Sequence, residues 1–178
     1  MMNVRKFCIT KLVWMTLLLC VLFSSIGTIS ASATELEKVD KPCFIINGTE
    51  KVYEGEDYYN EETGEYFYWG KGRGVDKTFS FKIRYSVESS GFTVNGKSVV
   101  VDASAHVTYD NDIVNYGSFE YHVYLNGLYS RKLVFNIEGT QTGTISGLKN
   151  GGTYRVMIST GAVLPDNYYL DGEGTITS

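Results

Sequence analysis

The feature that most constrains this chain is an alternation of apolar and polar residues over positions 79–87. Serine, lysine or arginine fills every second position, and the apolar positions between them are Phe79, Phe81, Ile83, Tyr85 and Val87. Successive side chains of a β-strand point to opposite faces, so the pattern predicts a strand with one face in a core and the other toward solvent. Half-buried strands of this kind are typical of antiparallel sheets.

Similar alternations recur at short spacing along the rest of the chain. They occupy residues 105–109, 119–125, 133–137 and 154–158, with shorter apolar groups at 44–46, 99–101, 168–170 and 175–177. Asn-Gly pairs at 47–48, 95–96 and 126–127 favour tight turns between them. No segment after residue 33 has a helical period. We therefore expect an all-β chain that forms a single antiparallel β-sandwich.

A dense group of aromatic residues lies before this sandwich. Two short runs, Asp57-Tyr58-Tyr59 and Glu65-Tyr66-Phe67-Tyr68-Trp69, flank a polar loop that ends at Gly64. They predict an aromatic β-hairpin that extends the sandwich at its N-terminal side and is joined to it by the glycine-rich segment 70–74.

The hairpin supplies the candidate ligand-binding residues. Both faces of the run 66–69 carry rings, so one face is expected to expose aromatic side chains, which stack on sugars or anchor protein partners. The alternative is that the rings pair across strands and only stabilise the hairpin. The candidates are Tyr58, Tyr59, Tyr66, Tyr68 and Trp69.

The first 33 residues have the pattern of a signal peptide. Arg5, Lys6 and Lys11 precede the apolar run 12–26, and Ala31-Ser32-Ala33 is a small-residue cleavage site. A membrane-spanning helix is the alternative, for which the run is short. We expect cleavage near Ala33-Thr34, secretion, and no stable membrane anchor. The expected segments are the leader 1–33, an arm with the hairpin and joint 34–74, and the sandwich 75–178.

Charge and cysteine content narrow the classes of partner. The chain has 16 basic and 20 acidic residues; the leader holds three of the basic and none of the acidic ones, which leaves 13 against 20, a net charge of −7. Nucleic acids and anionic membranes both attract positive proteins, so neither is expected as a partner. Cys8 and Cys20 lie in the leader, so Cys43 has no cysteine partner for a disulfide or a metal site. An exported chain without a disulfide suggests a Gram-positive bacterium.

The sequence shows no catalytic arrangement. His106 and His122 stand between core-type residues of alternating runs and are expected to face solvent. Cys43 is expected to be an inert thiol, a G-x-S-x-G motif is absent, and no spacing selects a facing pair of carboxylates. We therefore expect no enzyme activity, no catalytic residue and no cofactor.

Two acidic groups carry the oxygen atoms that calcium prefers. They are Asp110-Asn111-Asp112 and Asp171-Gly172-Glu173. Neither fits a twelve-residue calcium loop with glycine at its sixth position and a terminal glutamate. We interpret both as solvated turns and expect no metal site.

A turn motif lies near the C-terminal end of the chain. Residues 148–154, Leu-Lys-Asn-Gly-Gly-Thr-Tyr, predict a turn in which the Tyr154 hydroxyl bonds to backbone a few residues upstream. The spacing of Leu148, Gly151 and Tyr154 resembles the tyrosine corner of fibronectin type III and other immunoglobulin-like Greek-key sandwiches. By strand pattern the resemblance extends over residues 75–178. It implies a fold and leaves function open.

Together these features favour a secreted, non-catalytic, extracellular binding or interaction module whose ligand is a glycan or a protein. Because a fold does not specify a function, two other classes stay open. A small secreted hydrolase would require distant strands to bring a histidine beside acidic residues. A secreted toxin or bacteriocin-like effector would require a segment that inserts into a bilayer. The sequence does not indicate an oligomeric state.

Overall fold

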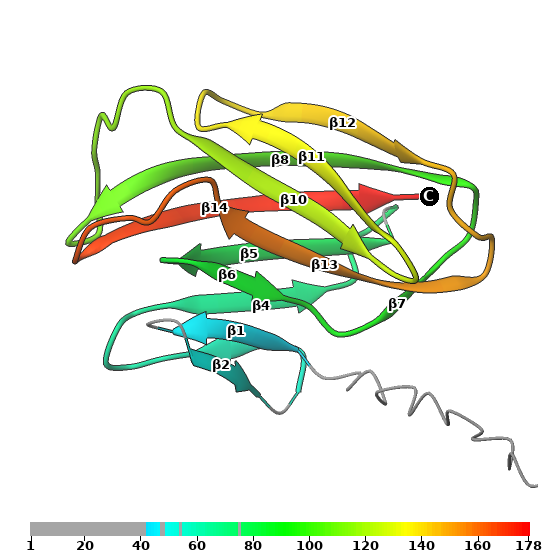
Figure 1. Ribbon diagram of the computed structural model, residues 1–178, viewed down its shortest axis with the longest axis horizontal. Coiled ribbons are helices and arrows are strands. Elements are labelled where there is room, and N and C mark those ends of the chain that lie inside the picture. The colour runs from blue at the N-terminus through cyan, green and yellow to red at the C-terminus, as the bar shows by residue number, and fades with distance from the viewer. Residues whose placement is uncertain (1–41, 47–48, 54, 75) are drawn as a thin grey trace, which may run out of the picture. The chain divides into compact units, whose positions relative to one another are not determined.

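The computed structural model describes residues 42–178 except 47–48, 54 and 75. In this part of the chain every regular element is a β-strand, and the strands form two antiparallel sheets of seven strands each (Figure 1). The predicted all-β antiparallel sandwich is confirmed. None of the described residues forms a helix that could cross a membrane. The predicted signal peptide and the arm that follows it lie outside the described residues.

The first sheet, sheet A, has the strand order β11-β10-β13-β6-β1-β2, and β7 pairs with β13. Its strands are β1 Cys43–Ile46, β2 Thr49–Val52, β6 Ser86–Glu88, β7 Phe92–Val94, β10 Glu120–Asn126, β11 Ser130–Asn136 and β13 Gly152–Thr160. Strands β1 and β2 pair antiparallel on either side of the turn predicted at residues 47–48, and the turn itself lies outside the described residues.

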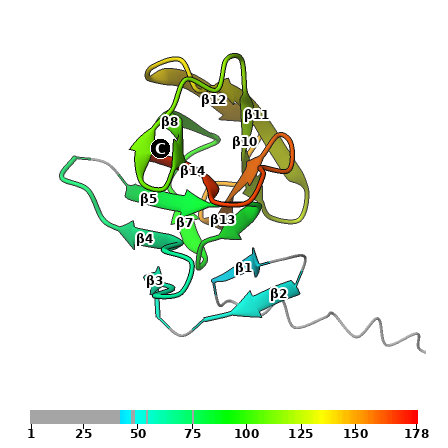
Figure 2. The same cartoon turned by 90° about the vertical axis from the view of Figure 1, so that its left-hand side faces the viewer.

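The second sheet, sheet B, has the order β12-β8-β14-β5-β4-β3, and β9 pairs with β8. Its strands are β3 Tyr58–Tyr59, β4 Tyr66–Gly70, β5 Lys77–Ile83, β8 Ser98–Tyr109, β9 Asp112–Ile113, β12 Gln141–Ser146 and β14 Tyr168–Thr177. Seen along the strands, β8, β14 and β5 form one layer and β10 and β13 the other (Figure 2).

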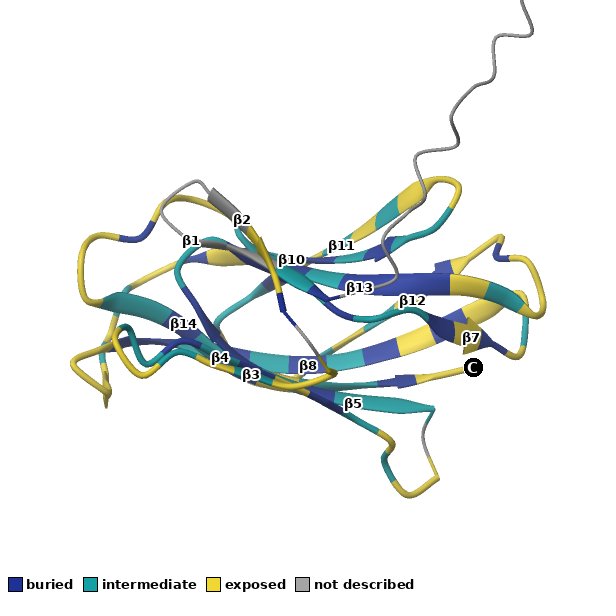
Figure 3. Ribbon diagram, turned by 90° about the horizontal axis from the view of Figure 1, so that it is seen from below, coloured by how far each residue is buried: buried dark blue, intermediate teal, exposed yellow. Residues whose placement is uncertain are grey.

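The core lies between the inner faces of the two sheets. On sheet B, β5 buries Phe79, Phe81 and Ile83, and on sheet A, β10 buries Tyr121 and Val123. In β10 each of these residues alternates with a less buried neighbour, and in β5 Ser80 does so between Phe79 and Phe81 while Lys82 is itself buried; the alternation appears as banded burial along the strands in Figure 3. The alternation in the sequence therefore corresponds to core and solvent faces, as a half-buried strand requires.

The run 79–87 forms two strands instead of the single strand that its pattern suggests. It leaves sheet B after Ile83 and enters sheet A at Ser86. Thr160 holds the crossing, because its backbone N–H donates to the Tyr85 carbonyl at 2.8 Å and its hydroxyl donates to the carbonyls of Arg84 and Tyr85. These long-range contacts are not visible in the local sequence pattern.

The aromatic hairpin continues sheet B. Strands β3 and β4 form the predicted hairpin, and β4 pairs with β5 from Tyr66 opposite Lys82 to Gly70 opposite Thr78. The glycine-rich segment 70–74 starts at the last residue of β4 and continues into the connection to β5. Within the described residues, the hairpin and the strands of the sandwich belong to one compact unit.

The C-terminal strand also differs from expectation. Residues 171–173, interpreted above as a solvated turn, lie within β14, which runs unbroken between β8 and β5 in the middle of sheet B. Gly172 lies opposite Phe81, and a β-carbon at position 172 would lie 2.8 Å from the tip of that ring. The same β-carbon would lie 2.5 Å from the Ser104 carbonyl oxygen of β8, so glycine here makes room for close neighbours on both adjacent strands, and it does not end the strand.

The turn before β13 has the predicted hydrogen bond. The backbone N–H of Lys149 donates to the Tyr154 hydroxyl at 2.8 Å, and the Tyr154 ring is buried. Leu148 is buried beneath the turn, and Gly151 has a positive φ of 71°, which favours glycine. The corner thus satisfies a backbone donor with a side chain from its own strand.

Candidate functional site

The candidate site is a hollow on the outer face of sheet B, with a volume of about 570 Å³. It crosses four neighbouring strands, β4, β5, β14 and β8. We call it the sheet B groove; its lining includes Asp57, Tyr68, Ser80, Asp102, Ser104 and Glu173.

Strand register explains why these residues meet. Tyr68 lies opposite Ser80, Ser80 opposite Glu173, and Glu173 opposite Ser104, so the four form one row across the sheet. In the next row Thr175 lies opposite Asp102. Small serine side chains flank Glu173 on both sides, so the sheet is hollowed beside the larger Tyr68 ring.

Tyr68 forms the aromatic wall of the groove. Its side chain is 44% exposed, and its ring stacks on that of Tyr66 with a centroid distance of 5.0 Å and an interplanar angle of 22°. The Tyr66 hydroxyl donates to Asp171 Oδ1 at 2.9 Å. Burial and this carboxylate acceptor both raise the pKa of Tyr66, so the hydroxyl keeps its proton and the pair is held in place.

The carboxylates of the groove come from three separate parts of the chain. Asp57 precedes β3, Asp102 lies on β8 and Glu173 on β14. Asp57 Oδ1 accepts a hydrogen bond from the Trp69 backbone N–H at 2.8 Å, and Asp102 Oδ1 accepts one from the Thr142 hydroxyl. Glu173 is exposed on the floor.

Basic residues are absent from the lining of the groove within the described part of the chain. The nearest row of sheet B holds Lys82, which lies opposite Tyr66 and Asp171. Its Nζ is turned away, because it donates to Asn111 and lies 4.9 Å from the centre of the Tyr169 ring. The groove therefore keeps an acidic character.

Three of the five aromatic candidates lie on this outer face. Tyr59 is 59% exposed on β3 and lies directly opposite Tyr66, so it continues the line of rings formed by Tyr66 and Tyr68. Cross-strand neighbours in this position point to the same face. The sequence-based expectation of an exposed aromatic face thus has a counterpart in these three tyrosines.

The other two candidates point to the core. Trp69 is only 3% exposed and stacks on Phe67 and Phe79, and Tyr58 lies opposite Phe67 with its ring 5.0 Å from that of Tyr53. Trp69 is among the residues that line the groove, but because its ring is buried we leave Trp69 and Tyr58 out of the exposed aromatic wall. The physical reason is the strand period, which places positions 66 and 68 on one face and positions 67 and 69 on the other.

Sequence reasoning missed the polar floor of the groove. Ser80, Asp102, Ser104 and Glu173 are solvent-side positions of three strands that are separated in the sequence. Their alternation with core residues was a usable signal for β5 and β8. These residues meet because of the order in which the strands pair, and no local sequence pattern predicts that order.

The histidines lie on outer faces. His106 faces out from β8, opposite Asp171 of β14, and His122 faces out from β10 with Nδ1 3.5 Å from the Tyr124 hydroxyl. Burial, followed by the charge of Lys132, lowers the pKa of His122. Neither histidine lines the groove.

The remaining candidates for chemistry have structural surroundings. Cys43 Sγ lies 3.9 Å from Glu88 Oε2 on sheet A. Asp110 and Asn111 form the turn between β8 and β9 with positive φ values of 47° and 75°. The described residues contain no group of three histidine, cysteine, aspartate or glutamate side chains arranged to hold a metal ion.

One buried carboxyl group lies outside the groove. Glu65 is 1% exposed, and burial raises its pKa. Its Oε1 accepts from the Arg84 backbone N–H at 3.0 Å and its Oε2 accepts from the Thr63 hydroxyl at 3.1 Å. These contacts tie the β3–β4 loop to the crossing between the sheets, which is a structural role.

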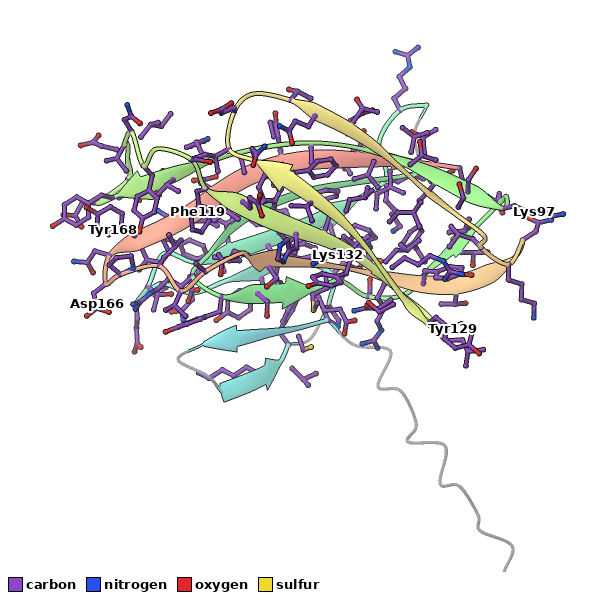
Figure 4. The ribbon with its side chains drawn as sticks, turned by 45° about the horizontal axis from the view of Figure 1, so that its top comes forward. Lys97, Phe119, Tyr129, Lys132, Asp166 and Tyr168 are labelled. Carbon is purple, nitrogen blue, oxygen red and sulfur yellow. The ribbon has the colours of Figure 1, made fainter. Side chains whose placement is uncertain are left out.

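A second group of rings lies at one end of the sandwich. Tyr168 is 4.8 Å from Tyr109 and 5.5 Å from Tyr116, and Tyr116 meets Phe119 edge to face at 5.5 Å, measured between ring centres. Figure 4 shows Tyr168, Phe119 and the nearby Asp166 at this end, and Tyr129 at the other. Tyr109 is 40% exposed.

No protein-family model matches the chain, and no curated protein matches it in sequence. Among solved structures, TmCBM61 in complex with β-1,4-galactotriose is 13% identical over 64% of this chain and 66% of that chain, with a TM-score of 0.31. BtGH115A, a GH115 4-O-methyl-α-glucuronidase with specificity for decorated arabinogalactans, is 13% identical over 76% of this chain and 19% of that chain, with a TM-score of 0.36.

A family two carbohydrate esterase from Cellvibrio japonicus is 13% identical over 70% of this chain and 30% of that chain, with a TM-score of 0.28. The chain thus spans less than two thirds of the length of each of these three structures. TM-scores of this size do not establish a common fold. The function proposed below rests on the residues of the sheet B groove.

Proposed function

We propose that the chain is a non-catalytic carbohydrate-binding module that holds a glycan in the sheet B groove. One observation carries the proposal: the exposed Tyr68 ring stands beside a floor of hydroxyl and carboxylate groups. A sugar ring has an apolar face and a polar edge. An aromatic wall and a row of hydrogen-bonding groups complement those two surfaces.

The aromatic wall is held in place before any ligand binds. Tyr66 stacks on Tyr68, and its own hydroxyl is fixed by Asp171 on a central strand. A ring that is already ordered loses little rotamer freedom when a ligand stacks on it, so more of the contact energy is retained as affinity.

The shape and polarity of the groove support a glycan over a protein as the ligand. A stable protein interface buries about 800 Å² on each partner around an apolar, well-packed centre. Here the centre is Ser80, Ser104 and the exposed Glu173. Hydroxyl-rich ligands match such a floor better than an apolar protein surface does.

The proposal does not include catalysis. Hydrolysis of a glycosidic bond requires a protonated carboxyl group with a raised pKa that faces a second carboxylate across the bond. The buried carboxyl group with a raised pKa, Glu65, binds its own loop with both oxygen atoms and does not line the groove. We further propose that residues 1–33 direct export and that the ligand is extracellular.

A glycan array followed by titration of the best ligand tests this function. The purified protein, Tyr68→Ala and Tyr129→Ala are compared. Tyr129 is 70% exposed on the turn between β10 and β11, at the end of the sandwich opposite Tyr168 (Figure 4), so it controls for loss of an exposed ring. We expect Tyr68→Ala to weaken binding by about tenfold and Tyr129→Ala to have no effect.

Two results would contradict the proposal. One is the absence of binding to every glycan on the array. The other is full binding by Tyr68→Ala together with loss of binding by Tyr109→Ala, which would move the site to the group of rings at the end of the sandwich.

A further inference from the structure

The sheet B groove has an unbalanced charge. Asp57, Asp102 and Glu173 contribute three carboxylates, and the described residues that line the groove include no lysine, arginine or histidine. Glu173 and Asp102 are diagonal neighbours, because Glu173 lies opposite Ser104 and Thr175 opposite Asp102. Diagonal positions on adjacent strands are close enough for long side chains to act on one ligand.

Two lysines near the groove have partners outside it. Lys82 Nζ binds Asn111 and the Tyr169 ring. Lys77 Nζ lies 5.1 Å from the centre of the Trp69 ring and 3.8 Å from Glu56 Oε1. Neither lysine therefore neutralises the floor of the groove; the other basic residue of the neighbouring row is His106, which lies opposite Asp171.

Because its carboxylates are not neutralised, the sheet B groove discriminates among sugars by their charge. It repels uronic acids and sulfated or phosphorylated sugars, and it attracts a protonated amine, most strongly at low ionic strength. The hydrogen bonds to Asp57 and Asp102 fix their carboxylates in position, so the chain does not have to rearrange to present them.

We propose that the sheet B groove selects glycans that carry a protonated amino group, such as oligomers of glucosamine, over neutral and anionic glycans. This proposal rests on the function proposed above. Tyr68 stacks on one sugar ring, and Glu173, two strands away in the same row, accepts from the ammonium group of the bound glycan. Two strand spacings amount to about 10 Å, so the two contacts fall on different parts of an oligosaccharide.

The test is a titration with hexasaccharides that differ in charge. The probes are hexamers of glucosamine, N-acetylglucosamine, glucose with β-1,4 linkages, and galacturonic acid, each measured at low and at high salt by calorimetry. We expect the glucosamine hexamer to bind about tenfold more tightly than its N-acetylated counterpart at low salt, with the preference shrinking at high salt.

Variants that remove single charges test whether the preference for glucosamine comes from the carboxylates of the groove. Glu173→Gln and Asp102→Asn keep the size of the side chain and remove one charge each from the groove. Asp112→Asn removes a charge from an exposed residue of β9 outside the groove and is the control. The first two variants are expected to reduce the preference for the glucosamine hexamer over the neutral hexamers to within about threefold, and Asp112→Asn is expected to keep the full preference.

The outcomes separate this proposal from the proposed function. Equal binding of charged and neutral hexamers, or tightest binding of galacturonic acid, would overturn the charge selection and leave a carbohydrate-binding module. Binding that requires added calcium would also overturn it, because the carboxylates would then hold a metal. No binding of any hexamer, with no glycan bound on the array, would overturn both.

Discussion

Gly174 of β14 lies directly opposite Phe79 of β5, and the Phe79 ring occupies the space that a β-carbon at position 174 would need. The same relationship holds for Gly172 and Phe81, which lie opposite each other two residues further along the two strands. The two glycines allow aromatic rings to pack across the backbone of the central strand. On the opposite side of that backbone, Glu173 forms the floor of the sheet B groove.

Gly174→Ala is expected to destabilise the protein by about 1–3 kcal/mol, because the added methyl group overlaps the Phe79 ring and forces the packed core to shift. Urea denaturation measures the change. Glu173→Ala, at the neighbouring outward position, is the control and is expected to change the free energy of unfolding by less than about 0.5 kcal/mol. An equal effect of the two substitutions would contradict the packing described here.

Trp69→Ala is expected to destabilise the fold by about 3–5 kcal/mol, since it removes a large ring from the core. Trp69→Phe should cost less, because the indole Nε1–H has no hydrogen-bond partner within the described residues. Folded Trp69→Phe is also expected to bind glycan with unchanged affinity. Thermal unfolding and titration of this variant measure both effects, and a selective loss of affinity would place Trp69 at the ligand.

Tyr154→Phe is expected to cost about 1 kcal/mol of stability, because it leaves the Lys149 backbone N–H without its acceptor at the corner before β13. Tyr129→Phe removes a hydroxyl from an exposed tyrosine and serves as the matched control. In urea denaturation, Tyr154→Phe should have a lower midpoint than Tyr129→Phe, and the free energy of unfolding should depend on urea concentration with the same slope in both variants. Coinciding midpoints would show that the corner hydrogen bond does not stabilise the fold.

Tyr121→Phe is expected to stabilise the protein by roughly 1 kcal/mol at neutral pH, since the buried Tyr121 hydroxyl has no hydrogen-bond partner within the described part of the chain. Burial raises the pKa of Tyr121 in the folded state above the value of about 10 that it has in the unfolded chain.

The raised pKa of Tyr121 also predicts a pH dependence. Above about pH 10 the unfolded chain releases the Tyr121 proton and the folded chain keeps it, so this group lowers the stability as the pH rises. Tyr121→Phe removes that contribution, and its advantage over the unmodified protein should grow between pH 9 and about pH 11. An advantage that is constant or shrinks with pH in denaturation experiments would refute this assignment.

The sequence was sufficient where the signal is local. Alternation identified the strands, and the hairpin of Tyr59 and Tyr66 and the Tyr154 corner could be predicted because the partners lie within a few residues of each other. It failed where distant contacts override local preference. Residues 171–173 suggested a turn, and the rings and backbone of the adjacent strands explain why glycine occupies a strand that continues.

The candidate site was predicted only in part for the same reason. The pattern around residues 66–69 indicated that one face would be aromatic, but it did not say which face. That choice depends on pairing with β5, whose inward Phe79 and Phe81 place Phe67 and Trp69 in the core. Glu173 and Asp102 enter the site through strand order, which no short motif encodes.

One backbone layer separates the groove from the core in sheet B, and consecutive residues of β4, β5, β8 and β14 belong alternately to one or the other. Along these strands, every second residue therefore belongs to the core and the residues between them to the groove. Under the function proposed above, substitutions at the outward positions would change the ligand while the inward positions keep the scaffold, so the specificity of this face would diverge between lineages faster than its architecture.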